Sequence, residues 1–288
     1  MYDTGPQAPA FIAPVHTENG GSQSVGAPPF ARQWRRALRT YEQDIDPSDK
    51  GDTVKRLLPD RRYTAPGLQK FISIGPLPLK GWNVQFEPYF GEPGWVRLEC
   101  RSGERARNDP TSVNRVGLDG YTDLFPIKQR VNELFSFVPG KNARAVKVGQ
   151  WLNFHEIHAT TLPGDIEQAG PLGFFLEWSS GLKRDVFRIV RNVPIRKGTA
   201  VVGKKPYILY QGDLTEGQRY NFAVDFYEHP TAGYVRIWQS NKQIVDYRGP
   251  FGYGGGRQNY PQFRIYRGQR TETAVTYTKI TSIRTITP

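Results

Sequence analysis

The C-terminal part of the chain is a series of short segments in which hydrophobic and polar residues alternate. The stretch YNFAVDFYEH places Phe222, Val224 and Phe226 at every second position, with Ala223 and Asp225 between them. Side chains of a β-strand point to opposite faces with a period of two, so these two sets lie on opposite faces. The pattern predicts a half-buried strand.

About a dozen such segments lie between residue 82 and the C-terminus, separated by turn residues. Two stretches, WQSNKQIV and LEWSSGLKRDVF, have the composition of β-hairpins. Strands do not alternate with helical segments here, which argues against a parallel sheet. We therefore predict an all-β fold for residues 82–288: one antiparallel two-sheet β-sandwich of the jelly-roll, concanavalin A-like type.

Residues 1–81 have a different character and are expected to form a short, partly irregular extension. Residues 1–29 are rich in Gly, Pro, Ala and Ser, which predicts a flexible or surface-draped arm. The next stretch, PPFARQWRRALRTYEQ, has Phe30, Trp34, Leu38 and Tyr41 at helical spacing. This helix either packs on the body through its aromatic side chains or attaches the chain to a larger assembly.

Composition narrows the choice of partners. The formal net charge of the 288-residue chain is +12, so its surface attracts polyanions such as nucleic acid, anionic lipid or an acidic polysaccharide. No nucleic-acid-binding motif and no apolar run long enough to span a membrane is present, so neither partner is expected. The N-terminus lacks the pattern of a signal peptide. The single cysteine, Cys100, excludes an internal disulfide and a cysteine-based zinc cluster.

The stretch NFHEIHAT contains the first candidate site residues. His155 and His158 are three positions apart, so on a strand they point to opposite faces and cannot share a metal ion. Glu156 and His158 are two apart and share a face. We expect no metal site, and Glu156 with His158 as a pair of site residues.

The stretch YPQFRIYRGQR contains the second set of candidates. Alternation places Tyr260, Gln262, Arg264 and Tyr266 on one face and Phe263 with Ile265 on the other. Such a row of phenol, amide and guanidinium groups suits a polar ligand. Two alternatives remain open: a cluster of stabilising Tyr–Arg contacts between strands, and stacking on nucleic-acid bases.

Four stretches, in this order, resemble motifs of the jelly-roll polysaccharide lyases of the heparin lyase I and glucuronan lyase-like group. RLECRSGERARNDPTSVNRVGL is similar to a strand and loop ending in Arg-x-Glu-Leu, and FHEIHAT stands where that group has Gln-x-His. GYVRIWQSNKQIVDYRGPFGY is similar to its Trp-containing hairpin, and NYPQFRIYRG to its Tyr-x-Lys-x-Gly-Ile-Tyr-Arg strand. The chain departs from these motifs at Glu156 (for Gln), Gly117 (for Glu), Gln262 (for Lys) and Arg264 (for Gly).

The resemblance implies cleavage of a uronic-acid-containing acidic polysaccharide by β-elimination. It implies that Arg115 neutralises the sugar carboxylate, that His158 removes a proton and that Tyr266 protonates the leaving oxygen. All three are then expected at one sugar junction, with His158 and Tyr266 roughly 5–9 Å apart. The remaining residues of the expected substrate-binding set are Glu156, Tyr260, Gln262, Arg264 and Arg267. No cofactor is required, and calcium is compatible with the group but not indicated by the sequence.

A second interpretation gives the same groove a binding function only. The chain would then be a non-catalytic carbohydrate-binding module, or a phage-tail or virion adhesin joined to a larger assembly by its N-terminal segment. Both interpretations predict an extracellular or virion-associated location.

Overall fold

The computed structural model describes residues 63–64, 70–76, 80, 82–89, 92–106, 109–120, 124–125, 127–166, 169–240 and 242–286. Their strands form two antiparallel sheets, which confirms the predicted all-β sandwich. The helix predicted for residues 30–41 lies outside the described residues. Within the described ranges there is no helix that could cross a membrane.

The first sheet has eight strands in the order β1-β2-β5-β14-β7-β8-β9-β10. In chain order these are β1 (Tyr63–Thr64), β2 (Lys70–Ile74), β5 (Val113–Asp119), β7 (Trp151–Ala159), β8 (Leu172–Ser179), β9 (Arg184–Lys197), β10 (Ala200–Gly212) and β14 (Asn259–Gly268). The two short strands β1 and β2 precede residue 82, and β2 pairs with β5. The sheet therefore includes residues that the sequence assigned to the N-terminal extension.

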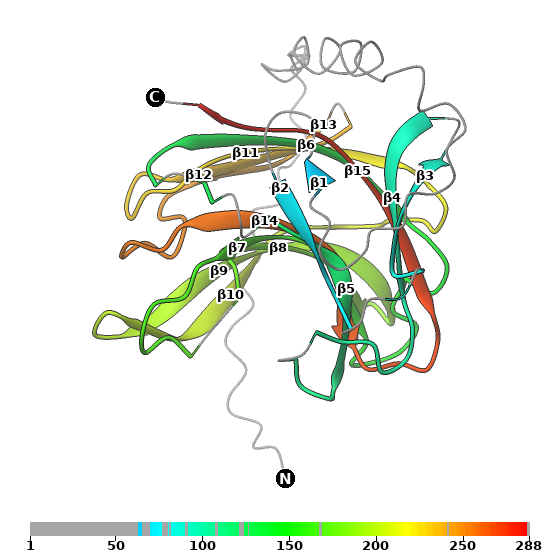
Figure 1. Ribbon diagram of the computed structural model, residues 1–288. Coiled ribbons are helices and arrows are strands. Elements are labelled where there is room, and N and C mark those ends of the chain that lie inside the picture. The colour runs from blue at the N-terminus through cyan, green and yellow to red at the C-terminus, as the bar shows by residue number, and fades with distance from the viewer. Residues whose placement is uncertain are drawn as a thin grey trace.

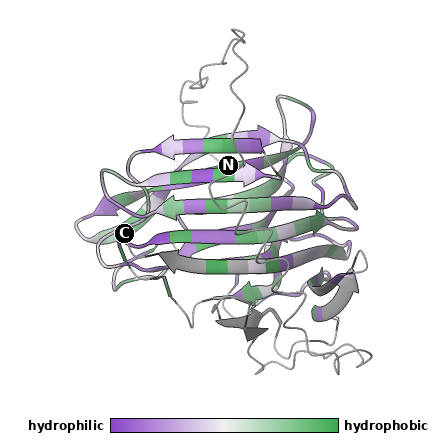
Figure 2. Cartoon of the chain, turned by 90° about the horizontal axis from the view of Figure 1, so that it is seen from above, coloured by the Kyte–Doolittle hydropathy of each residue, from purple (hydrophilic) through white to green (hydrophobic). Residues whose placement is uncertain are grey.

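The second sheet has seven strands in the order β13-β12-β11-β6-β15-β4-β3. In chain order these are β3 (Val84–Tyr89), β4 (Glu92–Cys100), β6 (Arg130–Pro139), β11 (Tyr220–Tyr227), β12 (Tyr234–Gln239), β13 (Lys242–Arg248) and β15 (Ala274–Ile286). The two predicted hairpins are confirmed as β8–β9 and β12–β13. Figure 2 shows this sheet from above, with hydrophilic and hydrophobic residues following one another along its strands.

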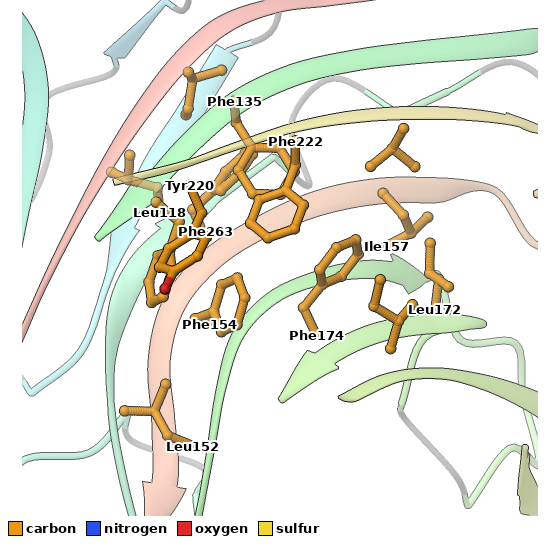
Figure 3. Packing of buried hydrophobic residues seen from close by; sticks show 14 of the residues in the cluster. Leu118, Phe135, Leu152, Phe154, Ile157, Leu172, Phe174, Tyr220, Phe222 and Phe263 are labelled. Carbon is orange, nitrogen blue, oxygen red and sulfur yellow. The ribbon is translucent and has the colours of Figure 1, made fainter. Parts of the chain in front are cut away.

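The two sheets stack face to face around an aromatic core (Figure 1). Phe135 and Phe222 come from the seven-stranded sheet, and Phe154, Phe174 and Phe263 from the eight-stranded sheet (Figure 3). All five rings are buried, and the Phe135 centroid lies 5.2 Å from those of both Phe222 and Phe263. Burying one such side chain stabilises the folded state by about 1.5–3 kcal/mol, so this core holds the eight-stranded sheet against the other sheet.

The core also contains a polar pair that joins the sheets. His155 on β7 and Glu133 on β6 are fully buried, and His155 Nε2 lies 3.0 Å from Glu133 Oε2. His155 Nδ1 lies 3.0 Å from the backbone oxygen of Gln262, which can only accept a hydrogen bond. As predicted, His155 and His158 point to opposite faces of the sheet, and His155 belongs to the core.

Candidate active site

A groove of about 750 Å³ crosses the outer face of the eight-stranded sheet. Its lining side chains come from β5, β14, β7, β8, β9 and β10, and the sheet bends so that this face is concave (Figure 1). Successive residues of β14 show the alternation: Phe263 and Ile265 enter the core, whereas Arg264 and Tyr266 line the groove. The two faces of β14 predicted from the sequence are therefore confirmed.

Arg115, His158 and Tyr266, the three residues expected to be catalytic, all line this groove. Arg115 on β5 is the register partner of Tyr266 on β14, and its guanidinium carbon lies 5.2 Å from the centre of the tyrosine ring. Arg115 Nε also donates to Asp109 at 2.8 Å, and a second guanidinium nitrogen bonds the same carboxylate. The phenol and a firmly held cation thus share one part of the groove.

His158 lies at a different point along the groove. Its register partner on β14 is Tyr260, whose ring centroid is 5.1 Å away, whereas the partner of Tyr266 on β7 is Asn153. His158 lies five positions after Asn153 on β7, which corresponds to about 16 Å of strand at roughly 3.3 Å per residue. The expectation that His158 and Tyr266 meet at one sugar junction does not agree with this register.

The register of β7 is irregular on both sides near Asn153: against β14 it shifts between Phe263 and Tyr266, which places Asn153 opposite Tyr266. The register of β7 against β8 shifts between Asn153 and His155, so both Phe154 and His155 point into the core. Asn153 and Glu156 then both face the groove, although strict alternation would separate them. Strict alternation in the sequence hides Asn153, and no other feature of the sequence signals this bulge.

Arg264 is the centre of a hydrogen-bond network on the groove floor. Its side chain is only 4% exposed; its Nε donates to Asn153 Oδ1 at 3.0 Å, and its two terminal nitrogens bond Gln262 Oε1 and the Glu156 carboxylate. Burial, and then repulsion by Arg115, lowers the pKa of Arg264 to about 9, which leaves it protonated at neutral pH. Glu156 supplies the compensating charge, so the pair is close to neutral toward a ligand.

All four departures from the lyase motifs meet at this network. Glu156 and Gln262 bond Arg264 directly, and Gly117 is the register partner of Arg264 on β5. The four positions therefore form one connected part of the groove floor around the buried Arg264 guanidinium.

The five residues expected to bind substrate occupy different positions. Glu156 and Arg264 line the groove. Gln262 is buried beneath it and donates to Asp119 at 2.8 Å, and Tyr260 is buried against the His158 ring. Arg267 is a correction: it is fully buried and donates to the backbone oxygens of Cys100 and Glu272, so it cannot reach a ligand in the groove. It directly follows Tyr266 on the strand, and alternation turns it away from the groove.

The walls of the groove add residues that the sequence did not suggest. Trp151 packs edge-on against Tyr266, with ring centroids 5.2 Å apart. Arg188 on β9 pairs with Glu177 on β8, and Lys204 extends the basic wall on β10. Each groove arginine thus has an acidic partner that fixes its position. Among the described residues, no group of three or more His, Cys, Asp or Glu side chains is placed to hold a metal ion.

No protein-family model and no curated protein matches the sequence. Among solved structures, a GH131 β-glucanase catalytic domain from Podospora anserina aligns with a TM-score of 0.51 and 10% identity, over 84% of this chain and 96% of that chain. An endo-β-1,4-glucuronan lyase from the fungus Trichoderma reesei gives 0.48 and 10% over 83% and 92%, and alginate lyase Aly36B gives 0.45 and 12% over 73% and 85%. The likeness to the glucanase supports the sandwich fold, and at these identities it assigns no activity.

Proposed function

We propose that this protein is a polysaccharide lyase that cleaves a uronic-acid-containing acidic polysaccharide by β-elimination. The observation that carries the proposal is the position of Tyr266: it lines the groove, and two guanidinium groups lie close to its ring, with Arg115 at 5.2 Å and Arg264 at 4.8 Å from the ring centre. The likeness of the sequence to the lyase motifs supports it independently.

The chemistry requires that the C5 proton leave, that the C4–C5 double bond form and that the C4–O4 bond break with protonation of O4. Arg115 binds the sugar carboxylate and withdraws charge from it, which acidifies the C5 proton. Because His158 lies about five strand residues away, Tyr266 serves as both base and acid: its phenolate takes the C5 proton, and the phenol returns a proton to O4. His158 then contacts a sugar farther along the polysaccharide.

The test is a screen of polyuronates for unsaturated products. Elimination leaves a C4–C5 double bond conjugated to the carboxylate, and this group absorbs ultraviolet light. We expect absorbance to rise with at least one polyuronate and to stay flat with neutral glucans. Lack of unsaturated products from all of glucuronan, alginate, polygalacturonate and heparinoid substrates would refute the proposal.

A non-catalytic carbohydrate-binding function is the second candidate, and one observation favours it. Arg115, Arg188 and Arg264 each already pair with a carboxylate of this chain, in the manner of a rigid binding surface. A protein of this kind would migrate more slowly in a gel that contains a polyuronate, and it would release no unsaturated product. The same screen therefore separates the two functions.

A further inference from the structure

The charge of the groove lining is almost balanced, although the chain as a whole is strongly basic. Four basic and three acidic side chains line the groove: Arg115, Arg188, Lys204, Arg264, Asp109, Glu156 and Glu177. Counted as for the whole chain, with histidine neutral, the lining has a formal net charge of +1, whereas the chain has +12. Most of the positive charge lies outside the groove, so the lining cannot neutralise a row of carboxylates.

Arg115 and Arg188 differ in the exposure of their acidic partners. The Asp109 side chain is 7% exposed and that of Arg115 is 21% exposed, so the groove meets mainly the guanidinium of this pair. The Glu177 side chain is 27% exposed and that of Arg188 is 21% exposed, and both line the groove. Arg188 Nε also donates to Gln211 Oε1 at 2.9 Å. A sugar carboxylate that approaches Arg188 therefore meets the negative charge of Glu177 as well.

Glu177 stands one step along the groove from the proposed reaction centre. Phe175 on β8 is the register partner of Asn153, which in turn is the register partner of Tyr266. Glu177 lies two positions after Phe175, which corresponds to about 7 Å of strand. The register partner of Glu177 on β7 is Trp151, whose ring packs against that of Tyr266. On this side, a sugar next to the one at Tyr266 would lie beside an indole ring and a carboxylate.

The other side of the reaction centre is apolar. Val190 lies two positions after Arg188 on β9, and its register partner on β10 is Ile208, which is 54% exposed; both line the groove. The buried ion pair of the groove floor is close to neutral toward a ligand. Lys204 is the register partner of Pro194, six positions after Arg188, or about 20 Å of strand. Apolar side chains pack against the C–H groups of a neutral sugar but do not neutralise a carboxylate.

We infer that Glu177 is a specificity-determining residue: it excludes a second carboxylate from the sugar next to the reacting uronate. The substrate is then a polysaccharide in which uronates are separated by neutral sugars. Like charges placed side by side disfavour a ligand even where its other contacts are favourable, so one acidic side chain can separate two polymers of the same linkage. The inference rests on the proposed function, because it takes the reacting sugar to be a uronate bound at Arg115 and Tyr266.

The experiment uses polymers that differ only in their carboxylates. Glucuronan, alginate and polygalacturonate are each supplied in the native form and after partial reduction of the carboxylates to primary alcohols, which converts some uronates to neutral sugars and leaves the linkage unchanged. The rates of formation of unsaturated product are compared at equal uronate concentration. We expect the wild type to cleave the reduced form of its substrate at least about threefold faster than the native form.

A substitution tests the role of Glu177 directly. Glu177→Gln removes the charge but keeps the side-chain length and an acceptor for Arg188, so the preference for the reduced polymer should fall at least about threefold. Asp213→Asn is the matched control, because it removes one negative charge from an exposed pair with Arg184, outside the residues that line the groove. We expect the control to keep the wild-type preference. The preference is a ratio within one variant, so a partial loss of folded protein does not affect it.

Three results would overturn the inference and leave the lyase proposal standing. The wild type cleaves the native polymer as fast as the reduced one, Glu177→Gln keeps the wild-type preference, or Asp213→Asn loses that preference to the same extent as Glu177→Gln.

A different result would separate the two proposals in the other direction. If no polymer yields an unsaturated product, the lyase proposal fails, and the affinities for the native and reduced polymers are compared by retardation in polymer-containing gels. Tighter binding of a reduced polymer that is lost in Glu177→Gln would support the role of Glu177. Equal binding of the two forms, or no binding of either, would overturn it.

Discussion

Arg264 and Gly117 are register partners on β14 and β5, and a Cβ at position 117 would lie 2.5 Å from the Arg264 Cβ. The Phe263 backbone oxygen would lie at the same distance, so a side chain at position 117 requires movement of a strand, and part of the overlap is with the Arg264 side chain. The lyase motifs that the sequence resembles have Glu at the position of Gly117 and Gly at the position of Arg264. In this chain position 117 is the glycine, and the large side chain is that of Arg264 on the neighbouring strand.

The first prediction tests this exchange. Gly117→Glu should destabilise the protein by about 1–3 kcal/mol, because the new side chain overlaps Arg264. Adding Arg264→Gly should restore part of the loss, with a coupling energy of about 1–3 kcal/mol in urea unfolding. Strictly additive effects of the two substitutions would show that the positions are independent.

The second prediction concerns the order of importance of the site residues. Tyr266→Phe keeps the ring between its two arginines but removes the proton donor, so turnover of a polyuronate should fall at least about a hundredfold. His158→Ala should act mainly on KM, since His158 lies about five strand residues from the reaction centre. Steady-state kinetics distinguish the two, and thermal unfolding checks that both variants fold. A His158→Ala variant with unchanged KM and a hundredfold lower kcat would restore His158 as the base.

The sequence predicted the faces of the strands well, because alternation is a local property. It correctly separated His155 from His158, and Phe263 from Arg264. It did not predict which residues stand opposite each other, because register depends on bulges and loop lengths that side-chain type does not encode. For that reason the short distance expected between His158 and Tyr266 does not agree with the register of β7 and β14.

The sequence also misjudged the surroundings of two single residues, Asn153 and Arg267, because the direction of a side chain depends on packing. Asn153 is an ordinary polar residue in a strand, and only the bulge turns it toward the groove. Arg267 appeared suited to a ligand by its charge, but its place on the strand buries it against backbone oxygens. Residue type suggests chemistry, and only the packed structure decides whether that chemistry reaches solvent.

The third prediction addresses the buried pair between the sheets. His155→Leu should cost about 1–3 kcal/mol, because it leaves the buried Glu133 Oε2 without its hydrogen-bond partner. The double variant His155→Leu/Glu133→Leu should recover most of that stability, since neither polar group of the pair remains in the core. Urea unfolding of the two variants measures the recovery. A double variant that is less stable than His155→Leu would show that Glu133 has another essential partner.

The last prediction concerns acid stability and the loops at one end of the sandwich. Asp165 and Arg257 are 2% and 1% exposed in their side chains, and Arg257 Nε donates to Asp165 Oδ2 at 2.8 Å. Asp165 also accepts the backbone N–H groups of Leu162 and Val201, while Arg257 ends the glycine-rich segment 252–256. The Asp165 carboxylate therefore connects its own loop with the segments that contain Val201 and Arg257.

Arg257, with the two backbone donors, lowers the pKa of Asp165 well below its ordinary value of 3.8. A lowered pKa means that the charged carboxylate stabilises the folded state above pH 3.8, and that this stabilisation is lost as the pH falls below 3.8. Asp165→Asn should therefore destabilise the protein by about 2–4 kcal/mol at pH 7, with a smaller difference from the wild type at pH 3. Asp213→Asn is the matched control, because Asp213 and its partner Arg184 are 63% and 52% exposed and such a pair contributes about 0–1 kcal/mol. The free energies of unfolding are measured in urea at the two pH values. If the difference between wild type and Asp165→Asn stays constant from pH 7 to pH 3, the charge of Asp165 does not stabilise the contacts between these segments.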